Sequence, residues 1–519
     1  MKTEAETITI PLSEYNEMKS ETAQLKQKYD QLSEQLRLLK NKKYASSSEK
    51  SEYDDRQLLF NEAEAEARPS EAEPKLIEIE KHYRKRSRLI TDKLPDDIAV
   101  EVIDHELPES ERICAECGEH LHEMGHESRR ELVIIPAQTK IREHVRHIYS
   151  CRSCEKHGTR VPVVKAQMSE PVIKGSFASP EAVSHIMSQK FVMSIPLYRQ
   201  EQELKRSGIL LSRQSMSNWI IKASEDWLEP IYEQMKAGLL REEVLHADET
   251  TLQVLNEPGK KAQSKSYMWL YRTSGDSTSP AVIYEYKPDR KSVNPHKFLE
   301  GFRGYVHTDG YDGYHKLSAD ITIVGCMAHA RRKFDEALRS LPEGDREGSI
   351  AAAGKRYCDR LFALESEYEG MSFEERHKKR QEKSKPLAEE FFSWAAECRA
   401  LPQSAAGKAA GYVLSQRKYL LNYLLDGRLE ISNNRAERSI KPFVIGRKNF
   451  MFANTPRGAK ASAVMYSIIE TAKENDISPY KYLMYIFENA PGCDISDEQT
   501  VQRFMPAAVK EAIASGLGV

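Results

Sequence analysis

Two Cys-x-x-Cys pairs constrain this chain most strongly, because they fix where a metal-bound module can form. Cys114 and Cys117 make up the first pair, and Cys151 and Cys154 make up the second. Two such pairs supply the four thiolates of a tetrahedral site that suits Zn²⁺. Four thiolates leave no open coordination position, so we expect a structural zinc ion in a zinc-binding domain over residues 100–165. Free thiols or a redox pair are the alternatives.

The remaining cysteine usage indicates the compartment. The other four of the eight cysteines are scattered, which is typical of buried thiols rather than of a disulfide framework. No stretch approaches the roughly 18 consecutive apolar residues of a membrane helix. The N-terminal segment also lacks the apolar core of a secretion signal. We therefore expect a soluble, intracellular protein.

A seven-residue repeat marks the N-terminal part of the chain. The d positions are Met18, Leu25, Leu32 and Leu39, and the a positions are Tyr15, Thr22, Tyr29 and Leu36. Four heptads predict a coiled-coil dimerisation helix over residues 8–45. An amphipathic helix that packs on its own protein is the alternative, because threonine and tyrosine make a poor seam. Residues 46–99 are polar and acid-rich, and they predict a linker.

Charge is distributed unevenly along the chain. The formal net charge is only −2, yet residues 61–80 carry seven acidic and two basic side chains. Residues 428–460, in contrast, carry eight basic and two acidic side chains. A patch of one sign matters more for binding partners than the sum over the chain, so a polyanionic partner is indicated.

A helical segment at residues 170–240 predicts a DNA-binding domain. Ser179 precedes Pro180 and Ser212 precedes Arg213, which are N-terminal signals of two helices, and Gly208 ends a helix between them. Three short helices with a tight turn before the last one outline a helix-turn-helix. Basic residues on this domain and on the cysteine module predict contacts with double-stranded DNA, among them Arg142, Arg146 and Arg213.

From residue 243 the pattern changes to strands. Several short β-branched and aromatic runs are followed by strand–helix alternation, which predicts a mixed sheet with helices at 293–300 and 327–340. Residues 343–428 carry no strand signal and predict an all-helical insertion. The first part of the α/β core is thus 241–342, the second part is 429–490, and a C-terminal tail covers 491–519. The fold class is multidomain α+β.

Three carboxylates carry the catalytic interpretation. Asp248 and Asp309 each stand in a His-x-Asp sequence at the expected end of a strand, and Glu437 follows a helix start capped by Ser432 or Asn433. Neighbouring strands would bring the two aspartates to one sheet edge. Two aspartates and a glutamate offer the hard oxygen ligands that Mg²⁺, or Mn²⁺, prefers.

Each carboxylate alone also has a structural interpretation. Asp309 could belong to an ordinary Asp-Gly turn, and Glu437 could pair with cations on its own helix. Glu249, Asp312 and Glu430 are nearby acidic residues that could be mistaken for ligands. The context favours catalysis on a polyanion, because candidate phosphate-binding cations surround the third carboxylate: Arg435, Arg447, Lys448 and Arg457.

In these motifs the chain resembles the large transposase of insertion sequence family sixty-six. The resemblance runs from end to end, through CAECG, CRSCE, IPLYRQEQEL, HADET, VHTDGYDGY, GCMAHARRKF and NNRAERSIKPFVIGRKNF. It implies an RNase H-like core whose acidic triad falls on Asp248, Asp309 and Glu437. The long interval before Glu437 is explained by the helical insertion.

The resemblance further implies a bacterial, cytoplasmic DDE-type transposase. Such an enzyme binds the terminal inverted repeats of its element, cuts them with two metal ions, and joins the 3′-hydroxyl to target DNA. A homodimer or higher oligomer and accessory proteins of the same element are the implied partners. An RNase H-like nuclease or resolvase without strand transfer is one alternative, and a catalytically inactive zinc and helix-turn-helix regulator is the other.

Overall fold

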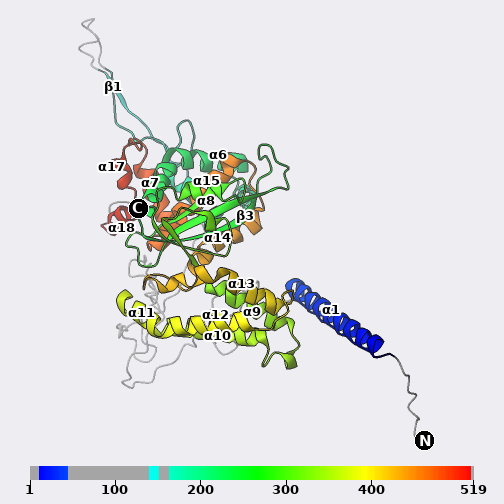
Figure 1. Cartoon of the computed structure of the whole chain (residues 1–519). Helices are drawn as coiled ribbons and strands as arrows, with labels where there is room; N and C mark the ends of the chain where they lie inside the picture. Colours follow the sequence, from blue (N-terminus) through cyan, green and yellow to red (C-terminus); the bar gives the residue numbers. More distant parts are fainter. Residues whose placement is uncertain (1–10, 45–138, 151–162, 516–519) are drawn as a thin grey trace, which may run out of the picture. The chain divides into compact units, whose positions relative to one another are not determined.

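The computed structural model describes residues 11–44, 139–150 and 163–515 (Figure 1). The chain divides into two units, one of residues 1–47 with 166–519 and one of residues 48–165. All four cysteines of the two Cys-x-x-Cys pairs lie outside the described residues, so the predicted zinc site does too.

The heptad segment forms the long helix α1, Leu12–Tyr44, as the sequence predicts. Leu25, Leu32 and Leu36 belong to the expected seam, and their side chains are exposed. Thr22, the weakest seam residue, donates its hydroxyl to the carbonyl of Met18 at 2.7 Å. The hydroxyl of a threonine inside a helix is satisfied when it donates to the backbone carbonyl four residues earlier in this way.

The smaller unit contains a two-stranded antiparallel sheet of β1, Ile148–Ser150, and β2, Val163–Lys165. Residues 139–147, which precede β1, have no regular structure. Arg142 and Arg146 lie in this irregular segment and are exposed.

The predicted helix-turn-helix segment forms helices where its capping signals stand. The helices are α4, Pro180–Phe191; α5, Leu197–Arg206; α6, Arg213–Ala223; and α7, Glu229–Leu239. The Ser179 hydroxyl accepts the Ala182 amide at 3.1 Å, and Gly208 has a φ of +81° after α5. A short π-helical turn, Ser224–Leu228, joins α6 to α7.

A five-stranded mixed sheet forms the centre of the larger unit, with the strand order β5-β4-β3-β6-β7. The strands are β3, Val244–Gln253; β4, Lys265–Thr273; β5, Val282–Lys287; β6, Gly304–Thr308; and β7, Ile321–Gly325. The first three strands pair antiparallel, whereas β6 and β7 run parallel to β3. The short helix α8, Val293–Phe298, connects β5 to β6.

Two long helices from the end of the chain pack on this sheet: α14, Asn434–Phe450, and α15, Pro456–Glu474 (Figure 1). On α15 the Ser467 and Thr471 hydroxyls accept the backbone amides of Tyr284 and Val282 at 2.8 and 2.9 Å. These bonds satisfy the free edge of β5, which blocks pairing with another strand. The sheet therefore ends at β5 because a helix covers it.

The region predicted as a helical insertion contains helices and no strand. Its helices are α10, Ile350–Glu367; α11, Phe373–Lys379; α12, Lys385–Glu397; and α13, Ala405–Leu420 (Figure 1). Helices α10, α12 and α13 pack with α9, Met327–Ser340. Arg380, on the π-helical turn before α12, is 1% exposed. Its guanidinium bonds both oxygens of Glu365 and the carbonyls of Tyr423, Asp426 and Leu429.

Three further helices complete the chain: α16, Pro479–Asn489; α17, Glu498–Gln502; and α18, Pro506–Ala514. They join the sheet, α4, α6, α7 and α15 in one hydrophobic core, while α9, α10, α12 and α13 share a second core with Leu429 and Ile431. Within the described residues, no helix is both long and apolar enough to cross a membrane.

Candidate active site

The register of β3 and β6 brings the two predicted aspartates to neighbouring positions. His246 pairs directly with His307 in this parallel pair, and the two rings stack with their centroids 4.2 Å apart. Each aspartate follows its histidine by two residues, so it points to the same face of its strand. Asp248 and Asp309 therefore lie side by side, as the sequence predicts.

The prediction that both strands end at the His-x-Asp sequence is correct only for β6. That strand ends at Thr308, whereas β3 continues past Asp248 to Gln253. It continues because β4 pairs with it antiparallel from Leu245 to Gln253, beyond the point where β6 stops.

Asn433 attaches the start of α14 to β3. It occupies the N-cap position, but its side chain forms no capping hydrogen bond, contrary to the sequence prediction. Instead its amide donates to the carbonyl of Ala247 at 2.8 Å, and its Oδ1 lies 3.0 Å from Nδ1 of His246. Its backbone amide contacts the sulfur of Cys326 at 3.1 Å. Glu437 is one helical turn further on, so this attachment fixes where its carboxylate lies.

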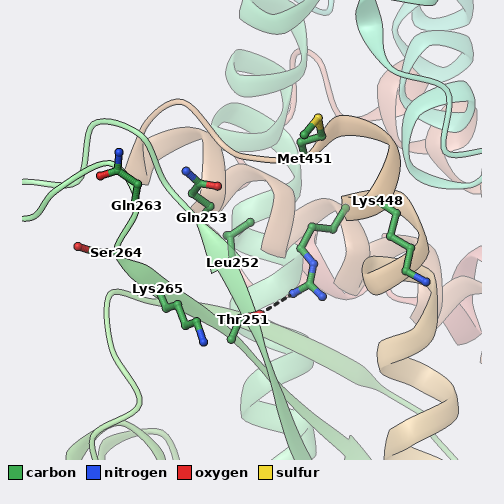
Figure 2. Close-up of a pocket in the computed structure, with 9 residues that line it drawn as sticks. Thr251, Leu252, Gln253, Gln263, Ser264, Lys265, Lys448 and Met451 are labelled. Carbon is green, nitrogen blue, oxygen red and sulfur yellow. Dashed lines mark hydrogen bonds between the residues drawn. The ribbon is translucent and has the colours of Figure 1, made fainter. Parts of the chain in front are cut away.

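Two cavities open along β3. The smaller has a volume of about 300 Å³, and its lining includes Asp248, His329 and Glu437. The larger has a volume of about 440 Å³ and lies at the other end of β3, where Figure 2 shows Gln253, Lys265, Lys448 and Met451 around it. We call the smaller cavity the carboxylate cavity and the larger one the cationic groove.

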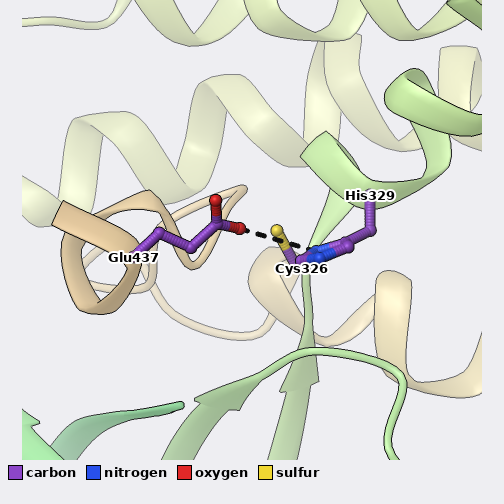
Figure 3. Close-up of side chains that lie close together, drawn as sticks. All are labelled: Cys326, His329 and Glu437. Carbon is purple, nitrogen blue, oxygen red and sulfur yellow. Dashed lines mark ion pairs between the residues drawn. The ribbon is translucent and has the colours of Figure 1, made fainter. Parts of the chain in front are cut away.

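Helix α9 supplies the partners of Glu437. Nη2 of Arg332 lies 3.2 Å from Oε2 of Glu437. Nδ1 of His329 lies 3.8 Å from Oε1 of Glu437, and Figure 3 shows the side chains of His329 and Glu437 pointing toward each other. Nδ1 of His329 and Oε1 of Glu437 are both buried without a hydrogen bond to a described residue. The ligand atoms of Cys326, His329 and Glu437 lie within 4.8 Å of one another, which is close enough to hold one metal ion.

The electrostatics of the carboxylate cavity favour a bound cation. Burial raises the pKa of Asp248 well above its ordinary value. The negative charges of Glu249, Asp309 and Glu437 add to this rise, so these carboxylates lie within electrostatic range of Asp248. Asp248 forms no ion pair with any described residue. A divalent ion would relieve this repulsion, and carboxylate oxygens are the ligands that Mg²⁺ prefers.

Burial also shifts the pKa values of the Cys326 thiol and the His329 imidazole beside Glu437. Burial raises the pKa of the Cys326 thiol to about 12, so the sulfur is protonated at neutral pH and is a poor ligand for a hard cation. Burial lowers the pKa of His329, and the negative charge of Glu437 partly opposes this lowering. The imidazole of His329 is therefore neutral, and it can accept or donate a proton beside Glu437.

Glu249 is next to Asp248 in sequence but points to the other face of β3, as strand alternation requires. It is 2% exposed, bonds Nε of Arg290 at 2.7 Å, and accepts the Tyr314 hydroxyl at 2.7 Å. These bonds give Glu249 a structural role. The same Arg290 lies 3.9 Å from Asp309, so it extends from this pair toward the site.

The predicted DNA-binding cations divide into two groups. Arg435 pairs with Glu430 at 2.7 Å, and Arg457 pairs with Glu225 through two bonds of 2.6 Å. Arg447 and Lys448, in contrast, form no ion pair within the described residues, and both line the cationic groove. Arg213 is exposed at the start of α6, where its guanidinium lies over the ring of Tyr198.

Sequence reasoning missed three residues that shape the site: His329, Arg332 and Asn433. The first two stand three residues apart on α9, directly after β7, and such a pair at the end of a strand is a usable signal. Asn433 was considered only as a helix cap, and nothing in its neighbouring sequence indicates its bonds to β3.

Four segments of the chain are similar to domains of transposases. Models of transposase domains match four segments: "Transposase IS66 family" at residues 175–461, "zinc-finger binding domain of transposase IS66" at 111–155, "Transposase C of IS166 homeodomain" at 31–103, and "IS66 C-terminal element" at 467–507. The chain belongs to the IS66 family of transposases. The zinc-finger match contains all four cysteines of the two pairs.

Similar proteins occur in Sinorhizobium fredii (strain NBRC 101917 / NGR234). Its uncharacterized protein y4hP is 30% identical over 478 residues, which cover 88% of this chain and 84% of y4hP. Its uncharacterized protein y4jD is 31% identical over 397 residues, covering 73% of this chain and 75% of y4jD. Among solved structures, the Drosophila P element transposase strand transfer complex aligns with a TM-score of 0.35 and 12% identity, over 57% of this chain and 92% of that one. That likeness is too low to support an argument.

Proposed function

We propose that this transposase binds the terminal inverted repeats of an insertion sequence and catalyses metal-dependent DNA cleavage and strand transfer. The observation that supports the proposal is the placement of the three carboxylates: Asp309 follows β6 beside Asp248 on β3, and Glu437 lines the carboxylate cavity together with Asp248. The repulsion among these carboxylates is the feature expected of a site that holds divalent cations.

The sheet supports an RNase H-like core. Three antiparallel strands are followed by two parallel ones, in the order β5-β4-β3-β6-β7. The first aspartate stands on the central strand β3, the second follows the adjacent strand β6, and the glutamate stands on α14, which packs against β3. This distribution agrees with the triad that the resemblance implies.

In the proposed mechanism Asp248, Asp309 and Glu437 would hold two Mg²⁺ ions, which would supply activation of the attacking oxygen and stabilisation of the leaving oxygen at a phosphodiester. Arg332 holds Glu437 in place before DNA binds, and its charge can then contact a phosphate. His329, neutral and beside Glu437, is positioned to exchange a proton with water or with the 3′-hydroxyl.

Other parts of the chain have proposed binding roles. Helix α6 presents Arg213, Gln214 and Asn218 on its exposed side, and such side chains read base edges in the major groove. The cysteine module would hold Zn²⁺ and contact DNA through Arg142 and Arg146. Helix α1 would pair two copies so that both ends of the element are handled together in the bacterial cytoplasm.

The test is cleavage and joining of DNA that carries the element's ends, with Mg²⁺, by the full chain and by Asp309→Asn. We expect the wild type to release a 3′-hydroxyl end and join it to target DNA, and Asp309→Asn to bind DNA without cutting. Asp312→Asn is the matched control, because the Asp312 side chain is 89% exposed and, among the described residues, pairs only with His315, at 3.6 Å. It should cut like the wild type.

The outcomes separate the alternative functions. Cleavage without joining would indicate a nuclease or resolvase. DNA binding with no Mg²⁺-dependent cleavage would indicate a regulator. Cleavage by Asp309→Asn at the wild-type rate would contradict the proposed catalytic site.

A further inference from the structure

The cationic groove is a separate site from the carboxylate cavity. Its floor is the second half of β3, and its walls are the start of β4 and the end of α14 (Figure 2). The side chains around it are three cations, two amides and one large apolar group: Lys265, Arg447, Lys448, Gln253, Gln263 and Met451. Its volume of about 440 Å³ is in the range of pockets that bind small organic groups.

The positive charge of the groove is not neutralised within the described residues. Arg447 holds its place by donating Nη1 to the hydroxyls of Thr250 and Thr251 at 3.2 and 3.1 Å. Burial lowers the pKa of Arg447, and its guanidinium forms no ion pair with any described residue. Lys265 and Lys448 are exposed and also lack an ion pair with any described residue. An anionic group would meet three available cations here.

Met451 adds an exposed apolar surface to this charged groove. It follows α14 with a φ of +66°, and its side chain is 68% exposed. The next residues are fixed to the end of β3, because the Ala453 amide bonds the Gln253 carbonyl and the Leu255 amide bonds the Ala453 carbonyl, both at 3.0 Å. The thioether is thus presented toward solvent from a fixed backbone. A flat base can pack on such a surface.

Neighbouring residues of β3 line the groove and the carboxylate cavity. Thr250 lines the carboxylate cavity, Thr251 lines the groove, and Arg447 bonds both hydroxyls. Asp248 precedes Thr251 by three residues on β3, which is about 10 Å along an extended strand. A DNA strand that crosses the carboxylate cavity could therefore continue into the groove within a few nucleotides.

We propose that the cationic groove binds an unpaired nucleotide of the DNA strand that passes through the carboxylate cavity. Lys265, Arg447 and Lys448 contact its phosphates, and its base packs on Met451. The amides of Gln253 and Gln263 face the edge of the base. Nε2 of Gln253 donates to the carbonyl of Ala262 at 2.9 Å, which leaves Oε1 as the acceptor for the base. This inference rests on the proposed function, because it requires a DNA strand at the carboxylates.

The experiment compares two fluorescent DNAs bound by the full chain carrying Asp309→Asn, which prevents cleavage. One is a blunt duplex, and the other is the same duplex with a short single-stranded extension of thymidines. We expect the extension to increase affinity. Lys448→Gln should reduce that gain and lower the salt slope for the extended DNA by about 0.7, the value for one phosphate contact on a single strand. Met451→Ala should reduce the gain with no change in salt slope.

The control is Arg303→Gln, which removes one exposed charge next to β6 at the end opposite Asp309. It should leave the gain from the extension unchanged. The inference is overturned if both DNAs bind equally well, or if Lys448→Gln weakens both to the same extent. Failure to bind either DNA would instead contradict the proposed function.

Discussion

Replacing Asn433 with alanine should loosen the start of α14 and displace Glu437. The Asn433 side chain is 1% exposed, and its two hydrogen bonds join the helix to His246 and to the backbone of Ala247. Alanine can make neither bond, and it leaves both partners buried. The helix itself should survive, since alanine tolerates this position, so the effect falls on its attachment to β3.

The magnitude follows from these two bonds. Leaving a buried polar group without its partner costs about 1–3 kcal/mol, so the attachment should weaken by about 2–6 kcal/mol. Local opening should then become at least about 30-fold more frequent, because 1.4 kcal/mol corresponds to a factor of ten. DNA cleavage should fall by about 100-fold or more, which is the cost of displacing a catalytic group by about 1 Å.

Hydrogen–deuterium exchange of the peptides that span β3 and the start of α14 measures this opening. Asn434→Ala is the matched control, because Asn434 is the next residue and its side chain forms no hydrogen bond with any described residue. Its exchange should stay close to that of the wild type. Equal exchange in Asn433→Ala and Asn434→Ala would refute the assigned role of Asn433.

Two further predictions concern buried charges. Because the folded pKa of Asp248 is raised, the stability that its neutral form contributes is present at low pH and is lost as the pH rises through that pKa. Asp248→Asn should therefore flatten the decline in thermal stability of the metal-free protein at higher pH, and an unchanged decline would contradict the buried, repelled carboxylate. Arg380→Met should destabilise the helical insertion by about 3–5 kcal/mol, because it leaves Glu365 buried without its partner. Lys383→Met, which breaks an exposed pair with Glu367, should cost less than about 1 kcal/mol, and equal protease sensitivity of the two variants would be the contrary result.

Features that depend on neighbouring residues were predictable from the sequence. Ser179 and Ser212 cap α4 and α6 as expected, because a cap needs only the amides of the following turn. Strand alternation also predicted that each aspartate shares a face with the histidine two residues before it, but the side-by-side position of Asp248 and Asp309 depends on the pairing of β3 with β6. The resemblance to the family was confirmed by comparison.

Features that depend on distant residues were not predictable. The sequence shows two strand runs around Thr250, but only pairing with β4 joins them into one strand. Arg457 stands among cations in the sequence, yet its ion-pair partner Glu225 lies 232 residues away. The zinc site and the coiled-coil dimer remain predictions.

The guanidinium of Arg380 has a consequence for how this family can change in length. It belongs to the insertion, but it bonds three carbonyls of the segment from Tyr423 to Leu429, which leads into α14. Leu429 and Ile431 are also buried in the same core as the insertion helices. A relative that lost the insertion would lose the support of the segment before its glutamate helix. Shortening is therefore compatible with activity only if another part of the chain rebuilds that support.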